Sequence, residues 1–295
     1  MKIFLGLFFS ILAALFWGAA IVMSKLTLKE IDSNYLFMIQ VSSSAIMAWI
    51  VLALNRKKIK FARNIKVYLL GVFEPFLAYV LSLHGLAYVN AGISSILFSS
   101  ESIMIVILST VILKNQITKI YALYSIIFIS SIGILILAWD DIIIGGNQKL
   151  LGYFLVLAGV FFAAIYVTLS SKAVEETSPI TLLTGQLTIA TVLSLLFLMP
   201  FIKFKLINNY ILMMAVCSGL CQYYFAFLLY LNSLKYLKVH VAGMTLYLIP
   251  VFTILGSYYF LGEGLTQLQI LGCFVVMCSV IVANFTLEDK NSLTH

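Results

Sequence analysis

The chain has 295 residues, of which 63% are apolar and only 10% are charged, and its mean hydropathy is +1.10. Soluble domains carry about a quarter of charged residues, so the composition excludes a water-soluble protein. The net charge of +7 then bears on orientation in a membrane, and we expect a lipid-bilayer partner and no nucleic-acid partner.

Ten long apolar runs follow one another along the chain. Each is about as long as the roughly 20 residues that cross a bilayer core. We expect transmembrane helices at 4–24, 34–54, 66–88, 92–113, 120–139, 150–171, 180–200, 209–232, 240–261 and 266–285. The runs are continuously apolar and do not alternate as the strands of a membrane β-barrel would. The sequence therefore predicts an all-α integral membrane protein with ten transmembrane helices.

Lysine and arginine gather in alternate connectors, which predicts the orientation. If the N-terminus is cytoplasmic, the other side of the membrane holds only five basic residues, Lys25, Lys29, Lys149, Lys203 and Lys205. By the positive-inside rule, both termini should then lie in the cytoplasm, and we expect a multi-pass protein of the bacterial inner (plasma) membrane. The basic cluster at 56–66 should be a cytoplasmic loop that contacts anionic lipid.

The two halves of the chain, 1–145 and 146–295, align with each other. Shifts of 146 and 148 residues, respectively, place Phe16, Ser24, Glu30 and Gln40 on Phe162, Ser170, Glu176 and Gln186, and Gly71, Glu74, Tyr88 and Leu113 on Gly219, Gln222, Tyr236 and Leu261. An odd number of spans in each half makes the second copy an inverted repeat of the first. Two such halves can exchange shapes, which predicts a transporter that works by alternating access.

Several short motifs follow one another along the chain in a characteristic order. They are Trp17-Gly18 followed by Lys25, then Leu234-Lys-Tyr236, Pro250, Leu261-Gly262-Glu263 and Gln269-Ile-Leu-Gly272. In order and spacing, over nearly the whole chain, they resemble the EamA-type ten-helix carriers of the drug/metabolite transporter superfamily. The resemblance implies a secondary carrier for amino acids or related metabolites, usually outward, with a proton gradient as one candidate driving force.

The first half departs from this pattern at several positions. Ala19 and Ala20 stand where members often carry small polar residues, while Ser102 and Lys114-Asn115 stand where the second half has Pro250 and Gly262-Glu263. We therefore expect the first half to move or bind differently from the second.

Glu101 is the first candidate site residue, because a charge inside the hydrocarbon layer costs about 2.5 kcal/mol or more and persists only with a partner or a use. It lies near the middle of the fourth predicted span, with Phe98 and Ser94 one and two turns earlier on the same helix face. A functional and a structural interpretation remain open. In the functional one, Glu101 binds the ammonium of a cationic or zwitterionic substrate or carries a coupling proton. In the structural one, it is an acid that fixes helix packing.

Glu74 is the second candidate, because Pro75 follows it in the third span and opens the helix by removing a backbone donor. The carboxylate could line a polar cavity or only satisfy groups freed by the kink. Gln222, at the equivalent place, keeps the hydrogen-bonding capacity without the charge. We expect Pro75 and Pro250 to act as hinges.

Rings beside polar or helix-breaking residues form a third group of candidates, Trp17, Tyr166, Tyr223 and Tyr247. Together they could make a stacking and cation–π wall for an organic substrate, although each alone could simply fill packing space.

Other functional classes fit less well. We expect no catalytic residue, cofactor or metal site, since the adjacent acids Asp140-Asp141 lack the further motif that a lipid-modifying membrane enzyme needs. A channel is disfavoured by the inverted repeat. An uptake carrier for a host-derived or nucleoside-like metabolite remains an alternative, and the chain could act as a monomer or homodimer.

Overall fold

The computed structural model describes residues 2–54, 66–112, 120–144, 146–170, 178–202, 206–233, 236–237 and 245–287. In these residues all regular structure is helical, and no strand occurs. The basic cluster except for Lys66, the motif residues Lys114 and Asn115, and the start of the ninth predicted span lie outside the described residues.

Ten apolar segments account for the described chain. In chain order they are α1 (Lys2–Thr27), α2 (Ser33–Leu54), α3 to α4 (Lys66–Leu69, η2 Leu70–Val72, η3 Phe73–Leu77, Ala78–Tyr88), α5 and α6 (Ala91–Ser99, Glu101–Ile112), α7 (Ile120–Ile144), α8 (Gly146–Ser170), α10 to η5 (Pro179–Leu193, η4 Ser194–Leu198, Met199–Phe201), α11 to α12 (Asn209–Gly219, η6 Leu220–Phe225, Ala226–Ser233), α14 (Leu248–Leu261) and α15 (Gln267–Leu287). Eight segments are long and apolar enough to cross a membrane, and two apolar helices, Leu248–Leu261 and Gln267–Val282, are shorter. The predicted all-α, ten-helix membrane fold is confirmed.

The boundary between the fifth and sixth spans differs from the prediction. We expected the fifth helix to end at 139, before Asp140-Asp141, but α7 continues to Ile144 and α8 begins at Gly146. The helix can continue because Asp141 is only 6% exposed and is hydrogen-bonded to Lys149 and Tyr153 of α8.

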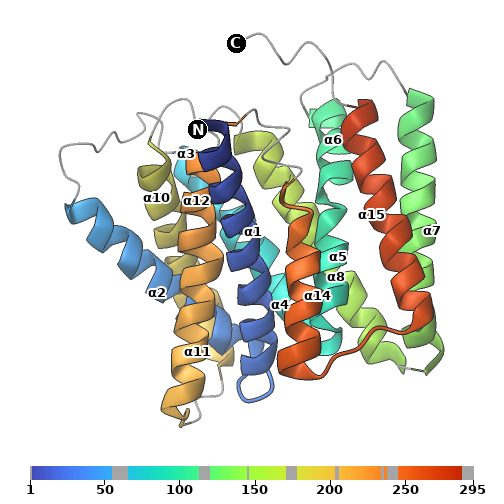
Figure 1. Ribbon diagram of the computed structural model, residues 1–295. Helices are drawn as coiled ribbons and strands as arrows, with labels where there is room; N and C mark the ends of the chain where they lie inside the picture. Colours follow the sequence, from blue (N-terminus) through green and yellow to red (C-terminus); the bar gives the residue numbers. More distant parts are fainter. Residues whose placement is uncertain are drawn as a thin grey trace.

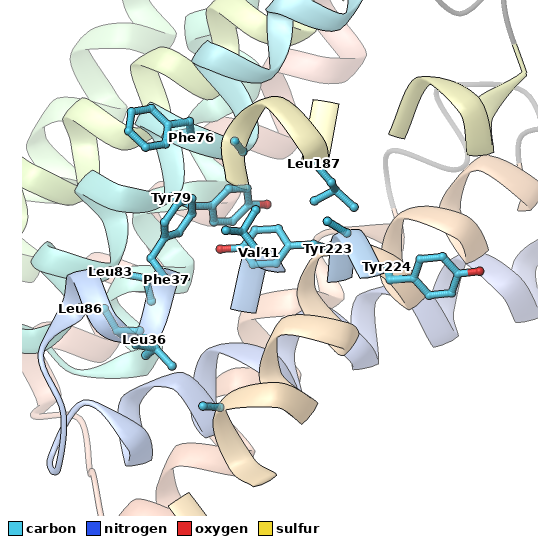
Figure 2. Packing of buried hydrophobic residues seen from close by; sticks show 14 of the residues in the cluster. Leu36, Phe37, Val41, Phe76, Tyr79, Leu83, Leu86, Leu187, Tyr223 and Tyr224 are labelled. Carbon is cyan, nitrogen blue, oxygen red and sulfur yellow. The ribbon is translucent and has the colours of Figure 1, made fainter. Parts of the chain in front are cut away.

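The helices pack side by side in one bundle, and the start of α1 and the end of α15 lie at the same end of it (Figure 1). α7 runs along α15, α4 packs against α8, and α1 packs against both α12 and α14. The largest buried cluster combines residues of α2, η3, α4, α10 and η6, including Phe37, Tyr79, Leu187 and Tyr223 (Figure 2). Helices from both halves of the chain therefore build one core.

Two close helix crossings join the halves. At Gly71 a Cβ atom would come within 2.7 Å of the Gln186 carbonyl oxygen, and at Gly219 it would come within 2.5 Å of the Gln40 Cα atom. These four residues are the ones that the shifts of 146 and 148 interchange. The same contact is thus made twice, once by each half against the other.

A second pair of contacts repeats in the same way. Gly152 lies against Tyr88 and Val89, while Gly6 lies against Tyr236 and Leu237. The same two shifts relate the two sets.

Candidate functional site

The third span is interrupted at Glu74, and the interruption turns its carboxylate inward. Glu74 has φ −141° and ψ 125°, outside the helical region, because a proline ring disfavours helical geometry in the residue before it. The surrounding segment Phe73–Leu77 is a π-helix, and Glu74 is 7% exposed. Short π-helical segments are frequent at functional sites.

The second half has a π-helix at the corresponding place without a proline. It covers Leu220–Phe225 and buries Gln222 and Tyr223. A shift of 148 residues carries Phe73 and Leu77 to 221 and 225, inside this segment. Both halves therefore widen their helix at the same level, one around a carboxylate and the other around an amide.

A small cavity lies between the two π-helices and the neighbouring spans. It is lined by Glu74, Pro75, Tyr166, Leu183, Gln186, Leu187, Tyr223 and Phe227. The space open to the centre of a water molecule is about 10 Å³, which is room for about one water. An organic molecule can enter only if the surrounding helices or side chains move.

Hydrogen bonds tie the polar side chains of this region together. The Tyr79 hydroxyl donates to Glu74, and Gln222 hydrogen-bonds to Tyr79. On the other wall, the Tyr166 hydroxyl donates to Gln186 Oε1 at 3.0 Å. The cavity lining thus has one carboxylate and no basic side chain.

Aromatic rings surround the same region. Tyr79 and Tyr223 meet edge to face with centroids 4.9 Å apart, and Phe98 stacks on Tyr79 at 6.3 Å (Figure 2 shows Tyr79 and Tyr223). Trp17 packs against Phe227 at 5.2 Å. Rings of the first, third, fourth and eighth spans therefore lie at the cavity or within two ring contacts of it.

Glu101 lies near the middle of the fourth span, as expected. A one-residue break at Ser100 divides this span into α5 and α6, so Glu101 is also the first residue of α6. It is partly exposed and close enough to Glu74 for the two charges to interact, but it does not line the cavity. A carboxylate at the start of a helix is favoured by the helix dipole, and both the binding and the structural interpretation of Glu101 stay predictions.

Pro250 and Tyr247 lie in the ninth span but do not line the cavity. Pro250 is in the first turn of α14, which begins at Leu248, where a missing N–H costs little because first-turn donors have no partner within the helix. A turn at residues 246 and 247 directly precedes this helix, and the hinge role of Pro250 stays a prediction. Tyr247 packs beside the separate cluster built around α5, α7, α8 and α15. Of the predicted site residues, the structure thus gathers Glu74, Pro75, Tyr166 and Tyr223 at the cavity, with Trp17, Phe98 and Gln222 adjoining it.

Several residues of this region were not predicted from the sequence as site residues, above all Tyr79 and Gln186. Gln186 already stood out as the repeat partner of Gln40. Tyr79 is five residues after Glu74, a spacing that shares a face only when the helix widens to a π-turn. Within the described chain, no group of three or more His, Cys, Asp or Glu could hold a metal ion.

Comparison with known proteins gives consistent results. A model of the EamA-like transporter family matches residues 4–138 and again 150–285. Two uncharacterized transporters of Archaeoglobus fulgidus are similar over most of their length. One is 24% identical over 271 residues, covering 92% of this chain and 95% of the relative, and the other is 22% identical over 281 residues, covering 91% and 93%.

A crystal structure of a protein has the same fold. It superposes with a TM-score of 0.66 at 14% identity, covering 98% of this chain and 99% of that one.

Proposed function

Because the chain belongs to the EamA-like transporter family, we propose that it is a secondary carrier that moves a small organic metabolite by alternating access. Its membrane would be the inner (plasma) membrane. The substrate class that fits the cavity best is an amine or amino acid, carried outward in exchange for protons. Uptake of a host-derived or nucleoside-like metabolite is the alternative.

The observation that carries this proposal is the buried carboxylate of Glu74 in the cavity between helices of both halves. A charge at this depth is costly and persists where it has a partner or a use. Tyr79 supplies one hydrogen bond, but no cation lines the cavity. The remaining capacity of the carboxylate suits an ammonium group or a proton, and the rings of Tyr166 and Tyr223 suit a cation as well.

The repeated contacts between the halves support alternating access. The helix crossing at Gly71 and Gln186 has the same form as the crossing at Gly219 and Gln40. Both crossings would therefore be preserved if the two halves exchanged their conformations. Inverted repeats with a site at their interface typically work in this way. The small volume of the cavity fits a carrier conformation in which the site is closed.

Ligand-induced thermal stabilisation tests the substrate class. The purified protein is heated with a panel of amino acids, amines, nucleosides and uncharged analogues at two pH values, and bound ligand raises the melting temperature by mass action. We expect amines or amino acids to stabilise the wild type and to lose this effect in Glu74→Gln. Glu30→Gln, which changes an exposed acid, should respond like the wild type.

The outcomes separate the alternatives. Stabilisation by nucleosides alone would favour the alternative substrate, and an unchanged response of Glu74→Gln would remove Glu74 from the site. Counterflow of the stabilising compound in proteoliposomes then distinguishes a carrier from a channel, because only a carrier exchanges labelled for unlabelled substrate against a gradient.

A further inference from the structure

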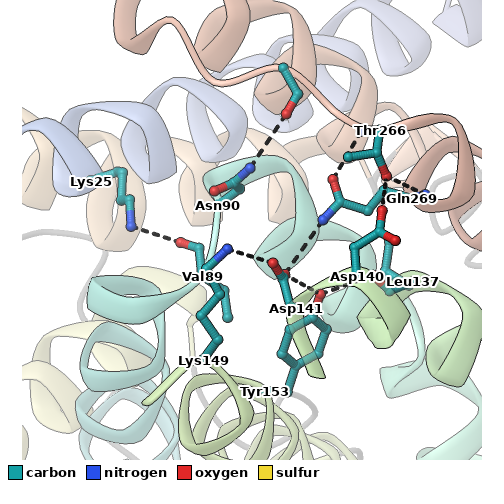
Figure 3. A network of polar contacts seen from close by, with 11 residues as sticks. Lys25, Val89, Asn90, Leu137, Asp140, Asp141, Lys149, Tyr153, Thr266 and Gln269 are labelled. Atoms are coloured by element: carbon teal, nitrogen blue, oxygen red, sulfur yellow. Dashed lines mark hydrogen bonds and ion pairs between the residues drawn. The ribbon is translucent and has the colours of Figure 1, made fainter. Parts of the chain in front are cut away.

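Lys25 does not line the cavity. Its side chain caps the C-terminal end of α4. Its ammonium donates to the carbonyl oxygens of Leu86 and Val89 at 2.7 Å each and of Ala87 at 3.3 Å. These carbonyls belong to the C-terminal turn of α4, where helices leave acceptors without an internal partner and favour a positive charge. Figure 3 shows Lys25 reaching Val89.

Glu263 caps the other side of the same turn. Its Oε2 accepts a hydrogen bond from the backbone N–H of Ala91, the first residue of α5, at 2.8 Å, and its Oε1 lies 4.0 Å from the Lys25 ammonium. Gly262 ends α14 with φ 68°, a left-handed conformation that suits glycine. The chain turns at Gly262, and this turn brings the Glu263 side chain to the first residue of α5.

The α4–α5 turn is thus held between two opposite charges. We call the bundle end where it lies, at the bottom of Figure 1, the Lys25 end. Both side chains are largely buried, with 12% of Lys25 and 15% of Glu263 exposed, and Asn90 adds a hydrogen bond to the Gly264 carbonyl at 3.5 Å. Glu263 belongs to the second half of the chain and the turn to the first, so the two halves cannot separate here without breaking these bonds.

The repeat has no charged counterpart of this arrangement. Shifts of 146 and 148 residues carry Lys25 and Glu263 to Ser171 and Asn115, which are neutral and lie outside the described residues. The repeat equivalents of Lys25 and Glu263 therefore cannot form the same ion pair.

We propose that Lys25 and Glu263 form a latch that holds the Lys25 end closed and biases the resting carrier towards the conformation open at the other end. The latch rests on the proposed function, because alternating access is what makes one closed end consequential. It gives a joint role to Lys25 and Glu263, which end two of the sequence motifs and do not line the cavity.

Hydrogen exchange of the full chain, followed by mass spectrometry without any ligand, tests the latch. Lys25→Met and the isosteric Glu263→Gln should each speed exchange by about tenfold or more at the α4–α5 turn, since a hydrogen bond to a charged group is lost. Exchange should also rise in the cavity-lining π-helices 73–77 and 220–225, because opening the end lets water reach them. Lys29→Met removes an exposed lysine nearby and should change neither region.

The pattern of exchange distinguishes a latch from a local cap. A rise confined to the turn, or no rise at all, would overturn the proposal. The double variant Lys25→Met with Glu263→Gln should match the stronger single variant, because side chains that act as one unit do not add. These measurements need no substrate, so a wrong substrate class leaves them unaffected, while a failed ligand panel leaves the latch intact.

A neighbouring polar cluster supplies a further control. Asp141 accepts hydrogen bonds from Lys149 at 2.5 Å, Tyr153 at 2.9 Å and Gln269 at 3.4 Å, and so joins α7, α8 and α15 at the same end (Figure 3). Asp141→Asn should loosen these three helices and, because Gly152 of α8 packs against Tyr88 and Val89, raise exchange at the α4–α5 turn only slightly and less than Glu263→Gln does. A rise at the turn as large as in Glu263→Gln would contradict a specific latch.

Discussion

At the scale of single residues, two carboxylates that look alike in the sequence have different surroundings. Glu74 is buried in a widened helix, receives a hydrogen bond from Tyr79 and faces the cavity. Glu101 begins α6 and lies outside the cavity lining. The residue next to a proline therefore has the better claim to substrate or proton binding.

Neutralising Glu74 should affect binding more than neutralising Glu101. We expect Glu74→Gln to weaken binding of a cationic substrate by about 30-fold or more, because removing one partner of a buried charge pair costs about 2 kcal/mol or more. Glu101→Gln should change it by about threefold or less, as for a charge whose role is structural. Equilibrium binding of the best compound from the thermal panel measures both, and equal losses would contradict this assignment.

Removing the Tyr166 hydroxyl should lower stability. Tyr166→Phe leaves the buried Gln186 Oε1 without the donor at 3.0 Å, and an unsatisfied buried acceptor costs about 1–3 kcal/mol. The melting temperature in detergent should fall relative to the wild type. Tyr124→Phe, at a position 62% exposed, should leave it unchanged, and an equal fall in both variants would show that the Gln186 bond is not the cause.

At the scale of elements, the bundle depends on places where helices depart from regular geometry or approach unusually closely. The π-helices at Phe73–Leu77 and Leu220–Phe225 turn Glu74 and Gln222 inward. The crossings at Gly71 and Gly219 bring backbones of opposite halves into contact. Small residues permit such close approaches between membrane helices. The π-helices border the cavity, and the glycine crossing at Gly71 lies against Gln186, which lines it.

Adding one methyl group at a crossing should destabilise the bundle. Gly219→Ala would place a Cβ atom 2.5 Å from the Gln40 Cα atom, and overpacking of this kind costs about 1–3 kcal/mol. The melting temperature should fall, while Gly264→Ala, where nothing lies within 4 Å, serves as the matched control. A Gly219→Ala variant as stable as the control would mean that the crossing is looser than described.

At the scale of the whole molecule, the arrangement has two ends with different chemistry. The Lys25 end carries the Lys25, Glu263 and Asp141 contacts, and the start of α1 and the end of α15 lie at the opposite end (Figure 1). The positive-inside rule predicts that the termini face the cytoplasm. The latch would then close the outer side and leave the resting carrier accessible from the cytoplasm, as outward transport needs.

The orientation can be measured in cells. In a chain whose four native cysteines are replaced, a single cysteine is placed at Asn208, which caps the start of α11 at the Lys25 end (Figure 1), or at Asn291, near the C-terminus. The two should differ in their reaction with a membrane-impermeant maleimide. We expect labelling of the cysteine at Asn208 in intact cells and of the cysteine at Asn291 only after permeabilisation. The reverse pattern would invert the orientation and turn the proposed latch towards the cytoplasm.

Hydropathy alone determined the ten helices, because a bilayer requires every backbone polar group to be satisfied within the spanning segment and so enforces long apolar runs. The repeat shifts, Glu74 with Pro75 and the ring candidates Tyr166 and Tyr223 could also be identified in the sequence. The break at Ser100 that moves Glu101 to a helix start, the π-turn that brings Tyr79 to Glu74 and the meeting of Lys25 with Glu263 were decided only by tertiary structure. Such contacts depend on local helix register and on how distant helices cross, and neither follows from the spacing of residues along one span.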